Sequence, residues 1–462
     1  MNNYFNFKEF DNTILITNDF GRYQFLDKEE FKRFFFETIH EGEDLFLRLK
    51  NDLFIIDEPT DIFSQEEYLH LRESKKYLLT GPVLHIFVLT NRCNASCRYC
   101  QANTLDASNH GDMKIQIAKK AVDIALDSPE QRLTFEFQGG EPLLNFPVIK
   151  FIVEYSQENK GNKTIDYTIV SNLSVMTKDI LEYLLRNKVS IGTSLDGNEW
   201  LHNANRPLKN GDNSFELVKK WIRVCCESGI EIGAIQTTSR ESISQYKEII
   251  DTYVELGIQN VFIRPLTPLG YAQARWEEIG YSPEEFIEFY GNCLQYILEL
   301  NSKGVNVRES HAGIFLSKII RGKGINYMEL RSPCGASIGQ LAYNYDGQIY
   351  TCDEGRMLAA MGDNSFCLGD VLNTKYDDLI ENPVSKATCI ASTLESIPSC
   401  CDCVYAPYCG VCPVINYALD GDIFSKQTNN YRCKVYKGML DKIFAILMGK
   451  PPKEIEILKT WI

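Results

Sequence analysis

The stretch that decides the fold is Cys93-Asn-Ala-Ser-Cys97-Arg-Tyr-Cys100, which follows the apolar run His85-Ile-Phe-Val-Leu-Thr90. Its three cysteines are spaced CxxxCxxC on a short loop. Sulfur is the soft ligand that iron–sulfur clusters prefer, so three thiolates suit a [4Fe–4S] cluster. Because such a cluster has four irons, three cysteines leave one iron able to bind a chelating group from outside the protein.

Chance and zinc are the alternative explanations of this spacing. The chain has 16 cysteines in 462 residues, from which roughly 0.02 instances of the spacing are expected over the whole chain. A structural zinc site usually closes with four ligands and more often uses CxxC pairs. The spacing therefore favours an iron–sulfur cluster.

With Tyr99 before its last cysteine, the loop resembles that of the radical S-adenosylmethionine (SAM) enzymes. The resemblance implies that SAM chelates the open iron and is cleaved to a 5′-deoxyadenosyl radical. Downstream, Gln138-Gly-Gly-Glu141-Pro resembles the family's GGEP segment, which receives the methionyl ammonium of SAM. Glycines let backbone approach a ligand closely, although an ordinary turn between a strand and a helix is the alternative.

Strand-like runs and amphipathic helices alternate from residue 83 to about 305. Six such units predict a parallel α/β sheet with right-handed crossovers. A partial (β/α)6 TIM-like barrel fits, and such barrels carry their chemistry on loops after the strands. The expected strands are Leu84–Thr90, Leu133–Gln138, Ile165–Ser171, Ser190–Leu195, Glu231–Thr237 and Asn260–Leu266.

Polar residues at the ends of these strands are candidates for SAM contacts. Small polar groups can hydrogen-bond ribose hydroxyls, and an arginine can fork onto a carboxylate, although each is more often a turn or cap residue. Arg264, on the sixth strand, faces either the same cavity or an acidic partner. The predicted SAM-binding residues are Tyr99, Gly139, Gly140, Glu141, Pro142, Ser171, Asn172, Ser194, Asp196 and Arg206.

Seven cysteines after residue 310 resemble the SPASM extension of radical SAM enzymes, which holds auxiliary [4Fe–4S] clusters. The resemblance implies three [4Fe–4S] clusters in all, with SAM as cofactor; two zinc sites are the alternative for this region. Cys412 comes one residue earlier than the family spacing CxxCx5CxxxC requires. The implied ligands are Cys93, Cys97 and Cys100 for the SAM cluster, Cys400, Cys403, Cys409 and Cys433 for the distal cluster, and Cys334, Cys352 and Cys412 for the proximal one.

The proximal set lacks an obvious fourth cysteine. Cys367 is the candidate, because a loop over 353–366 is long enough to fold back; otherwise one iron stays open to substrate. Asp353 follows Cys352 directly, and in anaerobic sulfatase-maturing relatives an aspartate after the equivalent cysteine deprotonates substrate. A carboxylate beside a cluster is a plausible catalytic base, and an exposed structural aspartate is the alternative.

Residues 1–80 form a separate predicted unit. Ile14–Thr17 and Arg22–Leu26 read as a hairpin, Asp27 as the cap of a helix, and Asp44 to Leu53 as a second helix. This order resembles the winged-helix peptide recognition element of enzymes that modify ribosomal peptides, which can bind a leader peptide as an added strand. A plain cap on the barrel is the alternative.

Bulk composition narrows the setting. The formal net charge of −14 argues against broad nucleic-acid binding. Half of this charge lies in residues 1–80, where 17 acidic and 10 basic residues give a net charge of −7. This segment is either a solvated acidic surface or a face that attracts a basic peptide. Apolar runs are too short for a membrane span. With no evident signal peptide, 16 cysteines favour a reducing cytoplasm.

Three longer stretches are Phe137-Gln-Gly-Gly-Glu-Pro-Leu-Leu-Asn145, Leu201-His-Asn-Ala-Asn-Arg-Pro207 and Asp353-Glu-Gly-Arg-Met357. They look like the radical SAM maturase of His-Xaa-Ser peptide systems, in which the positions matching Cys334 and Cys352 are often not cysteine. The expected domains are 1–80, the barrel 81–309, the SPASM domain 310–440, and a helix and tail 441–462. The resemblance implies radical cross-linking of a ribosomally made precursor peptide, with an electron donor such as flavodoxin or ferredoxin. An anaerobic sulfatase maturase that forms formylglycine and a zinc-stabilised peptide-binding scaffold are the alternatives.

Overall fold

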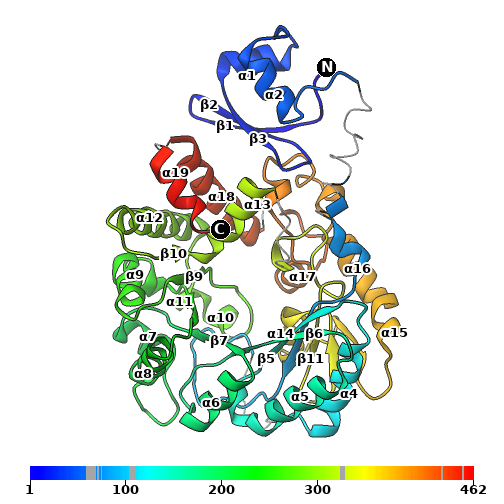
Figure 1. Cartoon of the computed structure of the whole chain (residues 1–462), viewed down its shortest axis with the longest axis vertical. Coiled ribbons are helices and arrows are strands. Elements are labelled where there is room, and N and C mark those ends of the chain that lie inside the picture. The colour runs from blue at the N-terminus through cyan, green and yellow to red at the C-terminus, as the bar shows by residue number, and fades with distance from the viewer. Residues whose placement is uncertain are drawn as a thin grey trace.

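The computed structural model describes residues 1–58, 69, 72–73, 75–102, 111–322, 328–427, 430–449 and 452–462. Figure 1 shows a small N-terminal sheet at the top, a large α/β region at the bottom, and C-terminal helices between them. Among the described residues, no helix has both the length and the apolar character needed to span a bilayer.

A ten-stranded sheet forms the α/β region, in the order β10-β9-β8-β7-β6-β5-β4-β11-β12-β13. Strands β4 to β9 are parallel neighbours, which confirms the predicted parallel α/β sheet. Each of the six lies within or beside its expected range. Their bounds are β4 Leu84–Val88, β5 Arg132–Gln138, β6 Thr164–Val170, β7 Val189–Ser194, β8 Gly233–Thr237 and β9 Asn260–Arg264.

Helices connect these strands and cover the sheet (Figure 1). The predicted helix from Pro283 to about Gly304 is confirmed as α12, which a capping box of Ser282 and Glu285 begins. The helices of this region are α4 Ile115–Leu126, α5 Phe146–Asn159, α6 Lys178–Arg186, α7 Glu199–Asn205, α8 Ser214–Glu227, α9 Tyr246–Glu255, α10 Tyr271–Ala274, α11 Trp276–Ile279 and α12 Pro283–Ser302.

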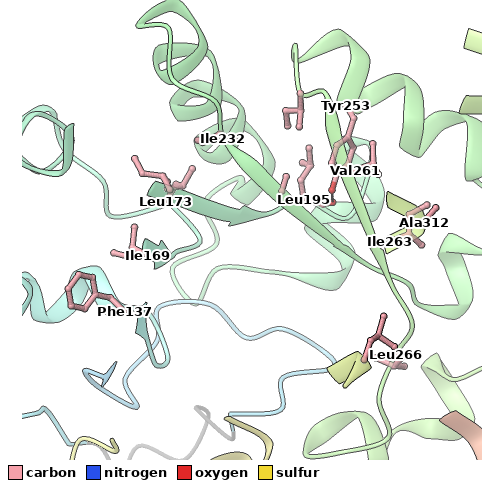
Figure 2. Close-up of a cluster of buried hydrophobic side chains, with 14 of the residues drawn as sticks. Phe137, Ile169, Leu173, Leu195, Ile232, Tyr253, Val261, Ile263, Leu266 and Ala312 are labelled. Carbon is pink, nitrogen blue, oxygen red and sulfur yellow. Dashed lines mark hydrogen bonds between the residues drawn. The ribbon is translucent and has the colours of Figure 1, made fainter. Parts of the chain in front are cut away.

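Side chains of the parallel strands alternate between the helices and the inside of the barrel. In β5, Leu133, Phe135 and Phe137 are buried, whereas the intervening residues are partly exposed, because successive side chains of a strand point to opposite faces. Figure 2 shows apolar side chains of this kind, such as Phe137 and Ile169, gathered behind the strand ends. The inward positions are thereby left to polar residues.

The C-terminal region completes the sheet, which the sequence did not predict. Strand β11 (Gln340–Tyr343) pairs in parallel with β4, and β12 (Gln348–Tyr350) and β13 (Cys367–Asp370) continue it in antiparallel fashion. The two-residue β10 (Arg308–Glu309) extends the other edge. The remaining helices are α13 Ser310–Arg321, α14 Asp353–Ala360, α15 Tyr376–Glu381, α16 Pro383–Ala391, α17 Pro413–Asp420, α18 Tyr431–Gly449 and α19 Pro452–Lys459.

The N-terminal unit is a three-stranded antiparallel sheet with two helices. The predicted hairpin is present as β2 (Thr13–Thr17) and β3 (Tyr23–Asp27), and Asp27 caps α1 (Lys28–Phe35) in a capping box. The sequence missed the edge strand β1 (Asn6–Phe10); α2 spans Asp44–Asn51. Part of the predicted 1–80 unit lies outside the described residues, and its winged-helix class stays a prediction.

Candidate functional site

A cavity of about 670 Å³ opens where the parallel strands end. The cysteine loop after β4, the segments after β5 to β9 and the start of α14 line it. All of the predicted SAM-binding residues except Glu141, Pro142 and Asp196 reach its wall. The ends of parallel strands and the loops after them are where barrels of this kind place their ligands.

The thiols of Cys93, Cys97 and Cys100 all line this cavity. Burial raises the pKa of Cys93 to about 12 and that of Cys97 to about 11. A thiolate is therefore stable here only beside positive charge, which the iron ions of a bound iron–sulfur cluster would supply. The donor set and its place at the cavity wall fit such a cluster.

Two backbone segments hold the cysteine loop. On one side, Ser96 N donates to Pro207 O at 2.8 Å and Arg98 N to Asn205 O at 3.0 Å. On the other, Gly140 N donates to Thr90 O at 2.8 Å. The loop is thus bound to the end of α7 and the residues that follow it, and the backbone just before the loop is bound to the GGEP segment.

Gly139 and Gly140 are glycine because the backbone just before the cysteine loop leaves no room for a side chain. A Cβ on Gly139, whose φ is +142°, would lie 2.2 Å from Thr90 O, and a Cβ on Gly140 would lie 2.1 Å from Arg92 O. Both glycines also line the cavity. The pair therefore brings backbone next to both the loop and the ligand space.

Glu141 lies behind the cavity wall with its carboxylate already engaged. It accepts hydrogen bonds from Ser171 Oγ at 2.8 Å, Asn172 N at 2.8 Å and Leu143 N at 3.1 Å. Burial raises its pKa to about 7. In the structure, Glu141 joins the segment after β5 to the segment after β6, and Pro142 is buried with it.

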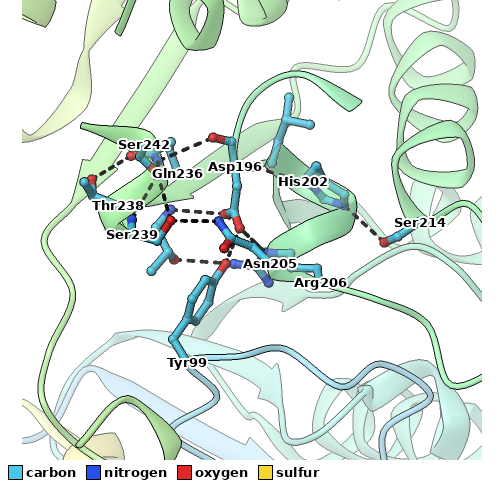
Figure 3. Close-up of polar contacts among 12 residues, drawn as sticks. Tyr99, Asp196, His202, Asn205, Arg206, Ser214, Gln236, Thr238, Ser239 and Ser242 are labelled. Atoms are coloured by element: carbon cyan, nitrogen blue, oxygen red, sulfur yellow. Dashed lines mark hydrogen bonds and ion pairs between the residues drawn. The ribbon is translucent and has the colours of Figure 1, made fainter. Parts of the chain in front are cut away.

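Tyr99, Asp196 and Arg206 form a buried network beside the cysteine loop (Figure 3). The Tyr99 hydroxyl donates to Asp196, and Arg206 Nε lies 3.2 Å from both oxygens of the same carboxylate. The guanidinium carbon of Arg206 is 5.1 Å from the centre of the Tyr99 ring. Asp196 is fully buried, so it fixes the loop and orients Arg206, whose side chain reaches the cavity.

Three C-terminal cysteines lie together next to the start of α14. Cys334, Cys352 and Cys412 are buried in one apolar cluster with Leu269 and Phe366. Cys352 is the N-cap of α14, and Cys412 is the N-cap of α17. Helix N-termini carry partial positive charge, which stabilises the thiolates and an anionic cluster there. The structure thus brings together the residues predicted for the proximal cluster.

Four other cysteines line a separate small cavity. These residues are Cys400, Cys403, Cys409 and Cys433, as predicted for the distal cluster. Burial raises the pKa of Cys400 and of Cys409 to about 12. Within the described residues, no three His, Cys, Asp or Glu side chains converge as ligands of one metal ion do. The thiolates of an iron–sulfur cluster each bind a different iron, so they need not converge on one point.

The structure does not bring Cys367 to the proximal cysteines. Its thiol contacts Gln348 Oε1 at 3.2 Å and packs with Val88, Ala342 and Tyr350 of the sheet. The expected loop over 353–366 begins with helix α14, and the chain then re-enters the sheet at β13, which starts at Cys367. The sheet therefore holds the thiol away from the buried group that contains Phe366.

Asp353 lines the main cavity but is paired. Arg356, one turn along α14, forms an ion pair with it, and the Arg356 Nε–Asp353 Oδ1 distance is 3.1 Å. Arg264 both lines the cavity and pairs with an acid, Glu329, at 2.9 Å. Both of the sequence alternatives for Arg264 are thus realised.

Several cavity residues were missed by the sequence reasoning. Glu136 lies inside β5, and burial raises its pKa to about 7; Gln138 donates a hydrogen bond to it. The period-two pattern of β5 could have placed these two inward. Glu329 and Glu354 carry no local signal, because they face the cavity only through C-terminal packing.

The fold and the three cysteine groups define a class, and the comparisons agree with it. Residues 87–252 match the model of the Radical SAM superfamily. The matched segment begins in β4 and includes the cysteine loop and the GGEP segment.

Two relatives in sequence are informative. The chain is 32% identical over 183 residues to the uncharacterized protein MJ0907 of Methanocaldococcus jannaschii, a match that covers 40% of this chain and 62% of that protein. It is 24% identical over 370 residues to a cysteine-type anaerobic sulfatase-maturating enzyme of Clostridium perfringens, covering 77% of this chain and 95% of the enzyme.

Two solved structures share the fold. Native anSMEcpe with bound AdoMet and Kp18Cys peptide superposes with a TM-score of 0.68 at 19% identity, covering 82% of this chain and all of that one. Streptococcus suis SuiB bound to precursor peptide SuiA superposes with a TM-score of 0.54 at 17% identity, covering 90% and 96%. Both of these structures contain a bound peptide.

Proposed function

We propose that the chain is a radical SAM enzyme that modifies a ribosomally made peptide. The observation that carries the proposal is one cavity lined by two kinds of group, cysteine thiols and carboxylates. The thiols of Cys93, Cys97 and Cys100 lie on it, and so do Asp353 and Glu354, which directly follow a cysteine of the second thiol group. Bound at these sites, a [4Fe–4S] cluster and SAM supply the radical that removes a hydrogen atom, with further clusters nearby.

The residues of the chain have separate roles in this proposal. Gly139 and Gly140 bring backbone to SAM, and Ser171, Asn172 and Ser194 face its polar groups. Arg206, which the ion pair with Asp196 orients, binds a carboxylate of SAM. Asp353 faces the peptide as the candidate base. The 10 cysteines of the three groups hold three clusters, to which flavodoxin or ferredoxin supplies single electrons.

The product we propose is an intramolecular cross-link, in the manner of the His-Xaa-Ser maturases that the sequence resembles. The peptide-bound neighbours support a peptide substrate. Formylglycine formation is the second candidate, because the match to the sulfatase-maturating enzyme covers most of both chains and Asp353 faces the cavity.

Anaerobic reconstitution tests the function. With iron, sulfide, SAM and a reductant, we expect about three [4Fe–4S] clusters per chain and release of 5′-deoxyadenosine. Each short peptide encoded beside the gene is then added and analysed by mass spectrometry. Fragmentation separates a link between two residues from formylglycine at one. Zinc in place of iron would support the scaffold alternative and contradict the proposal.

The N-terminal unit is the proposed site for the leader part of the peptide. Strand β1 is an edge of its sheet and carries Phe7, which is about half exposed, as is Phe35 at the end of α1. Both rings flank Phe31, at ring-centroid distances of 5.0 and 6.0 Å. An edge strand beside exposed aromatic rings suits an added peptide strand. Deleting the unit would uncover Tyr408, which donates to Gly21 O, so point variants are the better test.

We expect the double variant Phe7→Ser, Phe35→Ser to weaken binding of the modified peptide at least about tenfold, because aromatic anchors dominate such contacts. Calorimetry measures the affinity. Ile390→Ser, which changes an equally exposed apolar residue on α16, is the matched control. Unchanged affinity in the double variant would exclude this edge as the leader site, and cleavage of SAM without peptide should stay the same in both proteins.

A further inference from the structure

Strand β5 sends three side chains into the main cavity. Thr134, Glu136 and Gln138 all line it, because they occupy alternate positions of the strand and share its inner face. Two residues of a strand span about 7 Å, so Glu136 lies about 7 Å further along β5 from the GGEP segment than Gln138 does. The cavity therefore extends beyond the backbone that we assign to SAM.

Glu136 is an acidic side chain of the cavity without a cation. Within the described residues, its carboxylate accepts one hydrogen bond, from Gln138 Nε2, and forms no ion pair. Its neighbours on the two adjacent strands are Ile86 of β4 and Thr168 of β6, which carry no charge. Burial raises the pKa of Glu136 to about 7, because the ionised form is disfavoured when no positive charge offsets the lost water.

Both arginines of the cavity wall already have acidic partners. Arg206 pairs with Asp196, and Arg264 pairs with Glu329. Among the described residues, four acidic side chains line the cavity against these two arginines, so the wall has an excess of negative charge. A ligand that brings a positive charge beside Glu136 would remove the cost of burying an unpaired carboxylate.

We propose that Glu136 binds the side chain of a lysine or arginine of the substrate peptide and thereby selects which part of the peptide enters the cavity. The inference rests on the proposed function, because it takes the cavity to receive a peptide. Lysine and arginine fit because their charge persists at neutral pH and their long side chains can carry it along β5 past Gln138. The resulting buried ion pair fixes where the neighbouring peptide residues lie relative to the cysteine loop.

Anaerobic calorimetry on the reconstituted full chain, with SAM but without a reductant, tests this pairing. The probe is the peptide that the parent enzyme modifies, in which each lysine or arginine is replaced in turn by norleucine. At one position, we expect the replacement to weaken binding to the parent at least about tenfold, because the buried carboxylate is left unpaired. Glu136→Gln should bind the original peptide at least about tenfold more weakly, and the same replacement should then change its affinity little further.

Two further variants complete the test, and the iron content of each protein reports its folding. Glu136→Asp keeps a carboxylate and is expected to keep the preference for the charged side chain. Asp166→Asn removes a carboxylate of the next strand, where Asp166 pairs with Arg132, and is expected to match the parent.

Three results would overturn the inference. They are a modified peptide without lysine or arginine, norleucine replacements that leave binding to the parent unchanged, and replacements that weaken binding to the parent and to Glu136→Gln equally. A parent that modifies none of the peptides encoded beside the gene overturns the proposed function instead.

Discussion

Replacing Cys93, Cys97 and Cys100 by alanine is expected to abolish reductive cleavage of SAM while leaving the auxiliary iron in place. The three thiols lie on one loop at the wall of the main cavity, and the other two thiol groups lie elsewhere. Without thiolates, no ligand of suitable softness remains on that loop. We expect the release of 5′-deoxyadenosine to fall to the background level and the iron content to fall by about four per chain.

Chromatography of the nucleoside product and colorimetric iron analysis measure the two effects. The matched control changes Cys226, Cys389 and Cys401 to Ala, three partly exposed thiols outside the three groups. It should keep both the activity and the iron. Cleavage of SAM by the loop variant would show that the radical chemistry starts at another cluster.

The barrel was predictable because its signals are local. In β5, the alternation of Leu133, Phe135 and Phe137 with polar residues predicts both that the segment is a strand and which of its side chains are buried. The same holds for the cap Asp27, where a carboxylate and Glu30 three residues later form the capping box. Such patterns need only neighbours in the chain, so they could be read without any knowledge of the fold.

The closing strand β11 could not be predicted in this way. All four of its residues are buried, so it has no alternation, and it pairs with β4, which lies about 250 residues earlier. The edge of β4 that β11 pairs with is available only once the barrel has folded. The position of Cys367 depends on the same pairing, because β13 joins the sheet through β12. The length of the expected loop over 353–366 therefore could not show that strand β13 begins at Cys367.

In the candidate site, too, local features could be predicted from the sequence and long-range contacts could not. The three cysteines of the loop after β4 could be recognised from their spacing, because metal ligands on a short loop form a local pattern. The two other groups, which the family resemblance implied, each lie together in the structure. The roles of Glu141 and Asp196 were not local. The first was expected at the SAM ammonium and bonds to Ser171, and the second was expected at SAM and pairs with Arg206. A buried carboxylate takes whichever donors the fold brings to it, and sequence spacing does not state which these are.

Asp196→Ala is expected to release the cysteine loop from the barrel. Asp196 is fully buried, and it accepts the Tyr99 hydroxyl and pairs with Arg206, whose side chain is only 13% exposed. Removing one partner of a buried ion pair costs about 3–5 kcal/mol, because the other charge is left uncompensated. Tyr99→Phe, which removes only a hydrogen bond to a charged group, should cost about 1.5–3 kcal/mol.

Hydrogen–deuterium exchange is the suitable measurement, because a chain of several units does not unfold in one step. Peptides that cover 93–100 and 196–206 should lose protection in Asp196→Ala, whereas the C-terminal cysteine region should not. Unchanged protection of the loop would mean that its backbone bonds to the segment after α7 suffice to hold it.

The double variant Asp196→Ala, Arg206→Met separates charge from anchoring. It removes both charges, so the penalty of an unpaired buried guanidinium disappears and stability should return in part. The bond that holds Tyr99 is still absent, however, and Tyr99 lies between Cys97 and Cys100. We therefore expect the double variant to recover protection in 196–206 but to keep a loosened cysteine loop and a low iron content at the SAM site. Full recovery of both would show that the network stabilises the barrel without positioning the loop.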